Sequence, residues 1–207
     1  MHFQAVCVIL VSISLIKVEA FFNNSFDVIR GCKQYNGVVG YDEPLTYFPT
    51  SNFHNVGRTS NSRYFKIAVV AANDGIFRLG ETFFPYDRNV IEIVLGGWAN
   101  TQSAGRRQFR TASNRNTITQ LTIAKTPNLL SRFRPVMFVL EVFNDGLIEV
   151  RLDGQGGPLL SFRDTNRTPA NYIGFTKWNV DTIFFYDCPL LSDRTVYKSV
   201  PLNSTVG

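Results

Sequence analysis

The sequence predicts an all-β protein: a single domain built as an antiparallel β-sandwich, similar to a jelly roll. Apolar residues alternate with polar ones over several short segments, which is the pattern of strands with one buried face. Turn-forming residues separate these segments, and helical spacing of apolar residues is nearly absent. The chain has 207 residues and 18 phenylalanines, which suits one domain with ample apolar area for a core.

The first twenty residues, 1–20, have the pattern of a secretory signal peptide. Residues 3–16 are apolar with few exceptions, and Val18-Glu19-Ala20 offers small side chains at the −3 and −1 positions of a cleavage site. The alternatives are an uncleaved anchor or a buried helix, but the apolar run is shorter than the ~20 residues that span a bilayer. We therefore predict a secreted, extracellular protein without a membrane span, with its domain over residues 21–188 and a C-terminal tail over residues 189–207.

Export also bears on the cysteines and on three asparagines. Cys7 is removed with the signal, so Cys32 and Cys188 remain as a pair. In an oxidising compartment this pair predicts a disulfide, with two free thiols as the alternative. Closing so long a loop contributes on the order of 4–5 kcal/mol in the chain-entropy model. Asn-x-Ser/Thr sequons predict glycosylation at Asn23, Asn166 and Asn203.

Strands can be placed along the chain from the alternation of side chains. In Arg63–Ala72 every second residue from Phe65 onward is apolar, and residues 91–95 and 148–153 repeat the pattern. Pro135–Asn144 is apolar on both faces, which is typical of a central strand. Further strands are predicted at Thr117–Ala124, Leu159–Arg163, Tyr172–Thr176 and Thr182–Asp187.

Turns and one helix complete the predicted architecture. Asn73-Asp74-Gly75 and Asn144-Asp145-Gly146 each lie between two strand-like runs. Asp-Gly accepts the positive φ of a type I′ turn, so both segments are predicted to form tight hairpins. Residues 154–157 are rich in glycine and are predicted to form a further hairpin turn. The best helix candidate is Asn128–Arg132, just after a proline.

Several kinds of chemistry lack the residues that they need. After removal of the signal, His54 is the one histidine, and with disulfide-bonded cysteines it cannot complete the usual zinc ligand sets. A catalytic triad through His54 would have no Gly-x-Ser-x-Gly elbow. No glycine-rich turn leads into a helix, as an S-adenosylmethionine site in an α/β fold requires. The net charge of +5 is modest, which disfavours nucleic acid as a partner. We predict no catalytic residues, no metal and no cofactor.

The sequence favours a binding surface instead. Trp98 and Trp178 lie where strands end, and an asparagine follows each within two residues, at Asn100 and Asn179. An exposed indole stacks on a sugar face or an apolar ligand, while Asn, Gln and Arg side chains hydrogen-bond to hydroxyl groups or carboxylates. The alternative is that both indoles belong to the core.

A polar loop is predicted to follow Trp98 and to end at Arg106 and Arg107. With Arg110 and Arg115 these arginines form the densest basic cluster, which suits an acidic glycan, a carboxylate or a phosphate. A solvated basic face is the alternative. The predicted partner is a glycan or a small acidic ligand, and the predicted ligand-binding residues are Trp98, Asn100, Gln102, Arg106, Arg107 and Trp178.

Three segments resemble the farnesoic acid O-methyltransferase-like domain family of arthropods: Phe65–Leu79, Val90–Arg107 and Leu140–Tyr186. The most specific of them contains Gly-Gly-Trp-x-Asn-Thr-x-Ser, beginning at Gly96. The resemblance implies an all-β module, and the family name implies S-adenosylmethionine-dependent methylation of farnesoic acid in the juvenile hormone pathway. Two hypotheses follow: a secreted, lectin-like carbohydrate-binding module in extracellular recognition or defence, or alternatively a methyltransferase acting on farnesoic acid.

Overall fold

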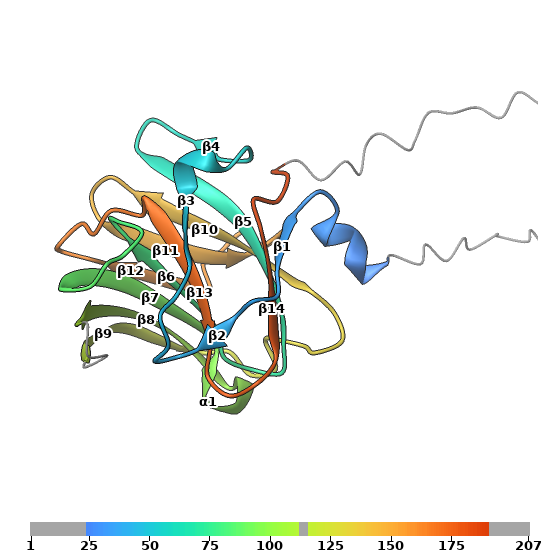
Figure 1. The fold of residues 1–207 in the computed structure, drawn as a ribbon. Helices are drawn as coiled ribbons and strands as arrows, with labels where there is room; N and C mark the ends of the chain where they lie inside the picture. Colours follow the sequence, from blue (N-terminus) through green and yellow to red (C-terminus); the bar gives the residue numbers. More distant parts are fainter. Residues whose placement is uncertain (1–23, 112–115, 191–207) are drawn as a thin grey trace, which may run out of the picture.

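A computed structural model describes residues 24–111 and 116–190 and confirms the predicted all-β sandwich of two stacked sheets (Figure 1). Sheet A has the strand order β1-β14-β5-β10-β11-β12, with β4 paired to β5. Its strands are β1 (Lys33–Tyr35), β4 (Gly57–Arg58), β5 (Ser62–Ala71), β10 (Val136–Phe143), β11 (Leu147–Leu152), β12 (Leu160–Arg163) and β14 (Thr182–Tyr186).

Sheet B has the order β2-β13-β6-β7-β8-β9, with β3 paired to β13. Its strands are β2 (Val39–Gly40), β3 (Tyr47–Pro49), β6 (Gly75–Gly80), β7 (Arg88–Gly96), β8 (Gln102–Arg110), β9 (Asn116–Lys125) and β13 (Tyr172–Lys177). Only β2 and β13 pair in parallel; the other strand pairs of the described residues are antiparallel. Short helical turns complete the fold at η1 (Ser25–Ile29), η2 (Thr50–Asn52) and α1 (Gly97–Asn100).

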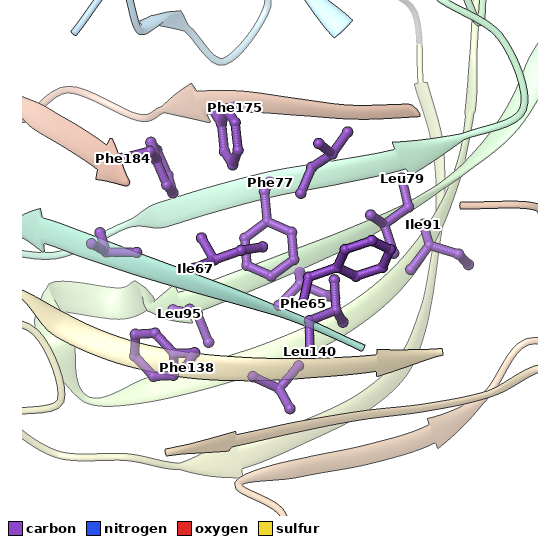
Figure 2. Packing of buried hydrophobic residues seen from close by; sticks show 14 of the residues in the cluster. Phe65, Ile67, Phe77, Leu79, Ile91, Leu95, Phe138, Leu140, Phe175 and Phe184 are labelled. Atoms are coloured by element: carbon purple, nitrogen blue, oxygen red, sulfur yellow. The ribbon is translucent and has the colours of Figure 1, made fainter. Parts of the chain in front are cut away.

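The core lies between the sheets and consists of inward-facing apolar side chains from strands of both sheets (Figure 2). Phe65 and Ile67 on β5 face Phe77 and Leu79 on β6, and all four are almost completely buried. The period-2 spacing found in the sequence places these residues on one face of each strand. Burying one such side chain contributes about 1.5–3 kcal/mol, so the many phenylalanines of the chain make the sandwich stable.

The eight strands predicted from alternation are all present, with ends within a few residues of those expected. Two turn predictions need correction. Asn73-Asp74-Gly75 does not close a hairpin, because β5 belongs to sheet A and β6 to sheet B, so the segment carries the chain across the sandwich. Asn144-Asp145-Gly146 does join a hairpin, β10 to β11. The turn there is not type I′, since positive φ occurs at Gly146 (88°) but not at Asp145.

Two further predictions are wrong. The polar stretch after Trp98 is not a loop, because residues from Gln102 onward form β8, paired on both sides with β7 and β9. The side chains of Arg106 and Gln108 lie on the outer face of sheet B, on the same side as Ala104, while Ser103 and Arg107 point to the opposite face. Asn128–Arg132 is not a helix, because Asn128 adopts φ 55° and the segment instead hydrogen-bonds to α1, Asn128 N donating to Asn100 O at 2.8 Å.

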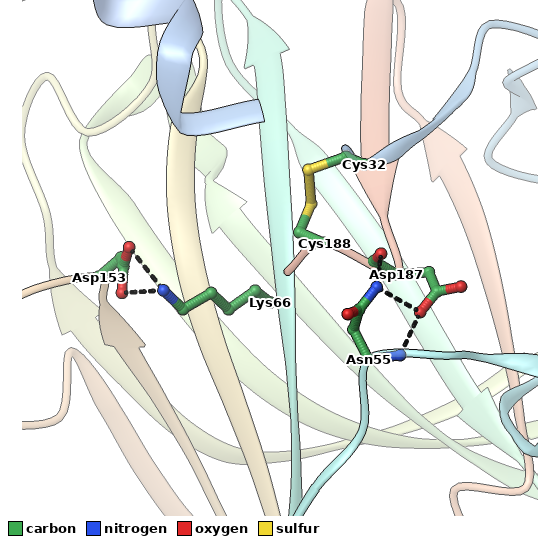
Figure 3. The surroundings of a disulfide bond; sticks show 6 residues. All are labelled: Cys32, Asn55, Lys66, Asp153, Asp187 and Cys188. Carbon is green, nitrogen blue, oxygen red and sulfur yellow. Dashed lines mark hydrogen bonds and ion pairs between the residues drawn. A yellow bond between two sulfur atoms is a disulfide. The ribbon is translucent and has the colours of Figure 1, made fainter. Parts of the chain in front are cut away.

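The predicted disulfide is present between Cys32 and Cys188, and it ties the start of β1 to the residue two positions after β14 (Figure 3). Beside it the carboxylate of Asp187 is buried and accepts hydrogen bonds from Asn55 N at 2.7 Å and from Lys33 Nζ at 2.9 Å. Burial acts to raise the pKa of Asp187, but these hydrogen bonds outweigh it and lower the pKa. This end of the sandwich is therefore joined both covalently and by buried polar contacts.

Several predictions fall outside the described residues: the signal peptide, Asn23, Asn203, Arg115 and the tail from residue 191 onward. Asn166 is exposed in a turn after β12. Within the described ranges, none of the helices has the length and apolar character needed to cross a bilayer.

Candidate ligand-binding site

The outer face of sheet B carries a hollow of about 600 Å³. Alternation along the strands explains its floor: Phe77 points into the core, so its neighbour Ile76 points outward, in register with Val94 on β7 and Ala104 on β8. Both tryptophans of the chain line this hollow. The lining residues are Tyr41, Asn73, Asp74, Ile76, Val94, Trp98, Ala99, Arg106, Ile118, Trp178 and Asn179.

Trp98 reaches the hollow through an unusual backbone turn. After β7, the three consecutive residues Trp98, Ala99 and Asn100 have φ values of 51°, 56° and 63°, all in the left-handed region. That conformation costs about 1–2 kcal/mol for each residue other than glycine, and such strain is concentrated at functional sites. The turn leaves the indole of Trp98 42% exposed, with Cζ of Arg106 5.1 Å from the ring centroid.

Asn100 holds this turn in place. Its Nδ2 donates to Leu130 O and its Oδ1 accepts from Leu130 N, both at 2.9 Å. The amide therefore has its main hydrogen-bonding partners within the protein, and Asn100 does not line the hollow. Asparagine also tolerates positive φ better than most residues, which explains why it occupies this position.

The remaining predicted residues also differ in whether they line the hollow. Arg106 lines the hollow, but Gln102 and Arg107 do not. Adjacent residues of a strand point to opposite faces, so Arg107 is directed away from Arg106 and donates to Asp164 at 3.1 Å and to Thr165 at 3.3 Å. Of the six predicted residues, the structure brings together Trp98, Arg106 and Trp178.

Trp178 lies on the side of the hollow formed by β13. Its side chain is 56% exposed, and its ring contacts Tyr41 edge to face, with centroids 5.1 Å apart. Tyr41 follows β2 directly and was not predicted as a site residue. No motif marks it in the sequence, because its role depends on the parallel pairing of β2 with β13.

The crossing segment between β5 and β6 supplies the polar groups of the hollow. Asp74 lines it, and burial raises the pKa of this carboxyl while the charge of Arg106 acts in the opposite direction. The side-chain oxygen of Asn73 is buried and accepts no hydrogen bond from any described residue. Asp74 N donates to Gly96 O at 3.0 Å, which fixes the crossing segment against the turn that carries Trp98.

A buried ion network underlies the hollow. Arg78 on β6 and Glu92 on β7 have fully buried side chains that form an ion pair of 2.9 Å. The second carboxylate oxygen of Glu92 accepts from Tyr41 Oη at 3.0 Å and from Arg106 Nη1 at 3.3 Å. Burial acts to lower the pKa of Arg78, but Glu92 outweighs it and the pKa is raised, so the arginine stays charged. The network fixes Tyr41 and Arg106, two residues that line the hollow.

The hollow combines flat apolar surfaces with hydrogen-bonding groups. Within residues 24–111 and 116–190, no cluster of three or more His, Cys, Asp or Glu side chains is placed to ligate a metal ion. Two indoles provide flat apolar surfaces, and the carboxylate, amide and guanidinium groups provide acceptors and donors between them.

Solved structures with a similar fold are distant in sequence. They include a legume lectin-like domain from Entamoeba histolytica (9% identity, TM-score 0.40, covering 77% of this chain and 88% of that one). A carbohydrate-binding module from Bacillus subtilis has 10% identity and a TM-score of 0.37, over 72% of this chain and 95% of that one. A β-glucanase from Bacillus licheniformis has 11% identity and a TM-score of 0.35, over 75% of this chain and 94% of that one. At such identities no activity is transferred from these proteins.

Among curated proteins, no sequence matches the chain significantly. A family model does match: that of farnesoic acid O-methyltransferase, over residues 41–190, which include both tryptophans, the crossing segment and the buried ion network. Because this match covers well over half of the sequence, the chain belongs to the farnesoic acid O-methyltransferase family.

Proposed function

We propose that this protein is a carbohydrate-binding, lectin-like module and that the hollow on sheet B is its ligand site. One observation carries the proposal: Trp98 and Trp178, far apart in the sequence, line the same hollow together with Asp74 and Arg106. Exposed apolar side chains that gather around one hollow are typical of interaction sites, whereas single ones are ordinary on a protein surface. Two tryptophans around polar groups form the combination that recognises a sugar ring.

The chemistry of the hollow supports a sugar in two ways. The C–H faces of a pyranose are apolar and stack on indole rings, while its hydroxyl groups both donate and accept hydrogen bonds. Asp74 and the unpartnered oxygen of Asn73 offer acceptors, and Arg106 offers donors. The volume of about 600 Å³ falls within the range of small-molecule sites.

A glycan array followed by calorimetry tests the proposal. We expect the full mature protein to bind at least one class of glycan, and Trp98→Ala and Trp178→Ala each to weaken this binding about tenfold or more. Phe133→Ala is the matched control, because Phe133 is 80% exposed but does not line the hollow. The proposal fails if no glycan binds, or if the tryptophan variants bind as tightly as the parent.

The family description favours a second function, methyl transfer from S-adenosylmethionine to farnesoic acid. Incubation of the pure protein with labelled donor and farnesoic acid measures it directly. Turnover above background would favour the enzyme over the lectin. Binding of S-adenosylmethionine alone would raise the melting temperature, since a ligand of the folded state stabilises it.

We also propose that the protein acts outside the cell and is glycosylated at Asn166. The Cys32–Cys188 disulfide supports an oxidising compartment, and Asn166 is exposed as an acceptor must be. Mass spectrometry of protein secreted from eukaryotic cells tests both points. An unmodified Asn166, or retention of the protein inside the cell, would contradict them.

A further inference from the structure

A second, narrower cleft opens on the outer face of sheet B, between residues 43–47 and residues 83–86. We call it the arginine cleft, because Arg78 and Arg110 both line it. The two side chains come from neighbouring parts of the sheet, and both residues are buried, with exposed fractions of 0% and 3%. Two positively charged guanidinium groups in one buried cleft need a physical explanation.

Arg78 has an unfilled donor there. Its Nε donates to Glu92 at 2.9 Å and its Nη2 donates to Tyr41 O at 3.1 Å. The third nitrogen, Nη1, is buried and has no hydrogen-bond partner among the described residues. An unpaired buried donor costs about 1–3 kcal/mol, and more when it carries charge, so this nitrogen favours an acceptor from outside the chain.

Arg110 adds a positive charge without a partner of opposite sign. Its Nη1 donates to Gln108 at 3.3 Å, and none of the carboxylates in the described part of the chain lies within ion-pair distance of it. Burial lowers the pKa of Arg110, and the charge of Arg78 lowers it further. Glu92 balances Arg78, so the charge of Arg110 is the one that favours an anion in the cleft.

One acidic residue also lines the cleft. Glu43 is exposed, and its Oε1 accepts from Gly40 N at 2.9 Å, so this carboxylate is held by the backbone and forms no ion pair with either arginine. It lies at the entrance, where it would weaken the attraction for an anion without filling the site.

The size of the cleft limits what can enter. Its free volume is about 10 Å³, close to the minimum that holds one water molecule. Such a volume admits only the leading oxygen atoms of a charged group, while the rest of a ligand stays outside, where Phe83 and Phe84 are 69% and 59% exposed. Oxyanions match the planar fork of a guanidinium group and bind it through paired hydrogen bonds.

We propose that the arginine cleft binds the charged group of an acidic glycan, a carboxylate or a sulfate ester, with Arg78 and Arg110 as donors. The glycan part of this inference rests on the proposed carbohydrate-binding function. Tyr41 connects the two sites: it lines the hollow, and its ring lies 4.5 Å from Cζ of Arg78. A sugar in the hollow would therefore contact Tyr41, and its acidic substituent or neighbour in the cleft would contact Arg78, which packs on the ring of the same tyrosine.

The test compares four probes by calorimetry: glucose, glucuronic acid, glucose 6-sulfate and inorganic sulfate. The sugars differ only at carbon six, so their comparison isolates the charged group and shows which oxyanion is preferred. We expect at least one charged sugar to bind about tenfold more tightly than glucose and more tightly than sulfate alone. Arg110→Gln should remove this advantage, because it keeps an amide donor but loses the charge and the fork.

Two further variants keep the test decisive if Arg110→Gln is unstable. Glu43→Gln removes the exposed acid at the entrance while keeping an acceptor for Gly40 N, so we expect charged sugars to bind roughly two- to fivefold more tightly. Arg163→Gln is the control, because Arg163 is half exposed on β12 in the other sheet and its loss should leave the binding unchanged.

The two proposals fail in different ways. If sugars bind in a manner that depends on Trp98, but charged sugars bind no more tightly than glucose, the arginine-cleft proposal is wrong and the carbohydrate function stands. Sulfate that binds the parent but not Arg110→Gln, with no sugar bound at all, would refute the carbohydrate function and still support an oxyanion site. Equal binding of charged sugars by the parent, Arg110→Gln and Glu43→Gln would refute the cleft.

Discussion

Asn100 offers the sharpest test of how the candidate site is built. It lies in the left-handed turn that carries Trp98, at φ 63°, and its amide both donates to and accepts from the backbone of Leu130. Sequence reasoning predicted Asn100 as a ligand contact, whereas the structure shows it fixing the turn against residues 128–130. Replacing it therefore changes stability first and ligand binding through the position of Trp98.

The magnitude follows from these contacts. Asn100→Ala removes two hydrogen bonds, each with a net contribution of about 1 kcal/mol, and it puts a residue that tolerates the left-handed region less well than asparagine at φ 63°, which costs about 1 kcal/mol more. We expect the free energy of unfolding to fall by about 3 kcal/mol. Asn100→Gly loses the same hydrogen bonds but relieves the backbone strain, so its loss should be smaller by about 1 kcal/mol.

Urea denaturation followed by tryptophan fluorescence measures both variants. Gln102→Ala is the control from the same segment, because the Gln102 side chain makes no hydrogen bond within the described residues, and its effect should stay within about 0.5 kcal/mol. If Asn100→Ala is as stable as the parent yet abolishes glycan binding, Asn100 is a ligand contact and the structural reasoning is wrong.

Three other predictions concern the rest of the domain. Glu92→Gln leaves Arg78 buried without its ion pair, so we expect the free energy of unfolding, measured by chemical denaturation, to fall by about 3–5 kcal/mol. A fall of less than 1 kcal/mol would mean that the network does not stabilise the fold. The pKa of Asp187 is lowered by folding, so its stabilisation is present above the unfolded pKa of about 3.9 and is lost as the pH falls below it. Asp187→Asn should therefore flatten the stability profile between pH 4 and pH 2, and a profile as steep as that of the parent would contradict this. Reduction of Cys32–Cys188 should destabilise the fold by about 4–5 kcal/mol in the chain-entropy model, and an unchanged melting temperature in reductant would refute that estimate.

Local patterns in the sequence were enough to predict the strands and the fold class. The alternation around Phe65 and in residues 148–153 depends only on which face of a strand is buried, and that property is encoded residue by residue. The pairing of Cys32 with Cys188 was also predictable, because once Cys7 is assigned to the predicted signal peptide each of the two has only one possible partner. The two tryptophans were predicted as ligand residues from their type and their position at strand ends, and Arg106 from its place in a basic cluster; all three line the hollow.

The tertiary structure alone decided which of these residues meet. Asn73-Asp74-Gly75 resembled a hairpin turn, yet it crosses between the sheets, because strand partners are chosen by long-range packing and not by the turn residues. Tyr41 joins Trp178 only through the pairing of β2 with β13. Arg78 and Glu92 read as ordinary strand residues, and their burial follows from segments distant in sequence that cover the outer face of sheet B. Alternation of side chains is a local property of the backbone. A binding site requires contacts between segments that are distant in sequence, and those contacts depend on how the whole domain packs.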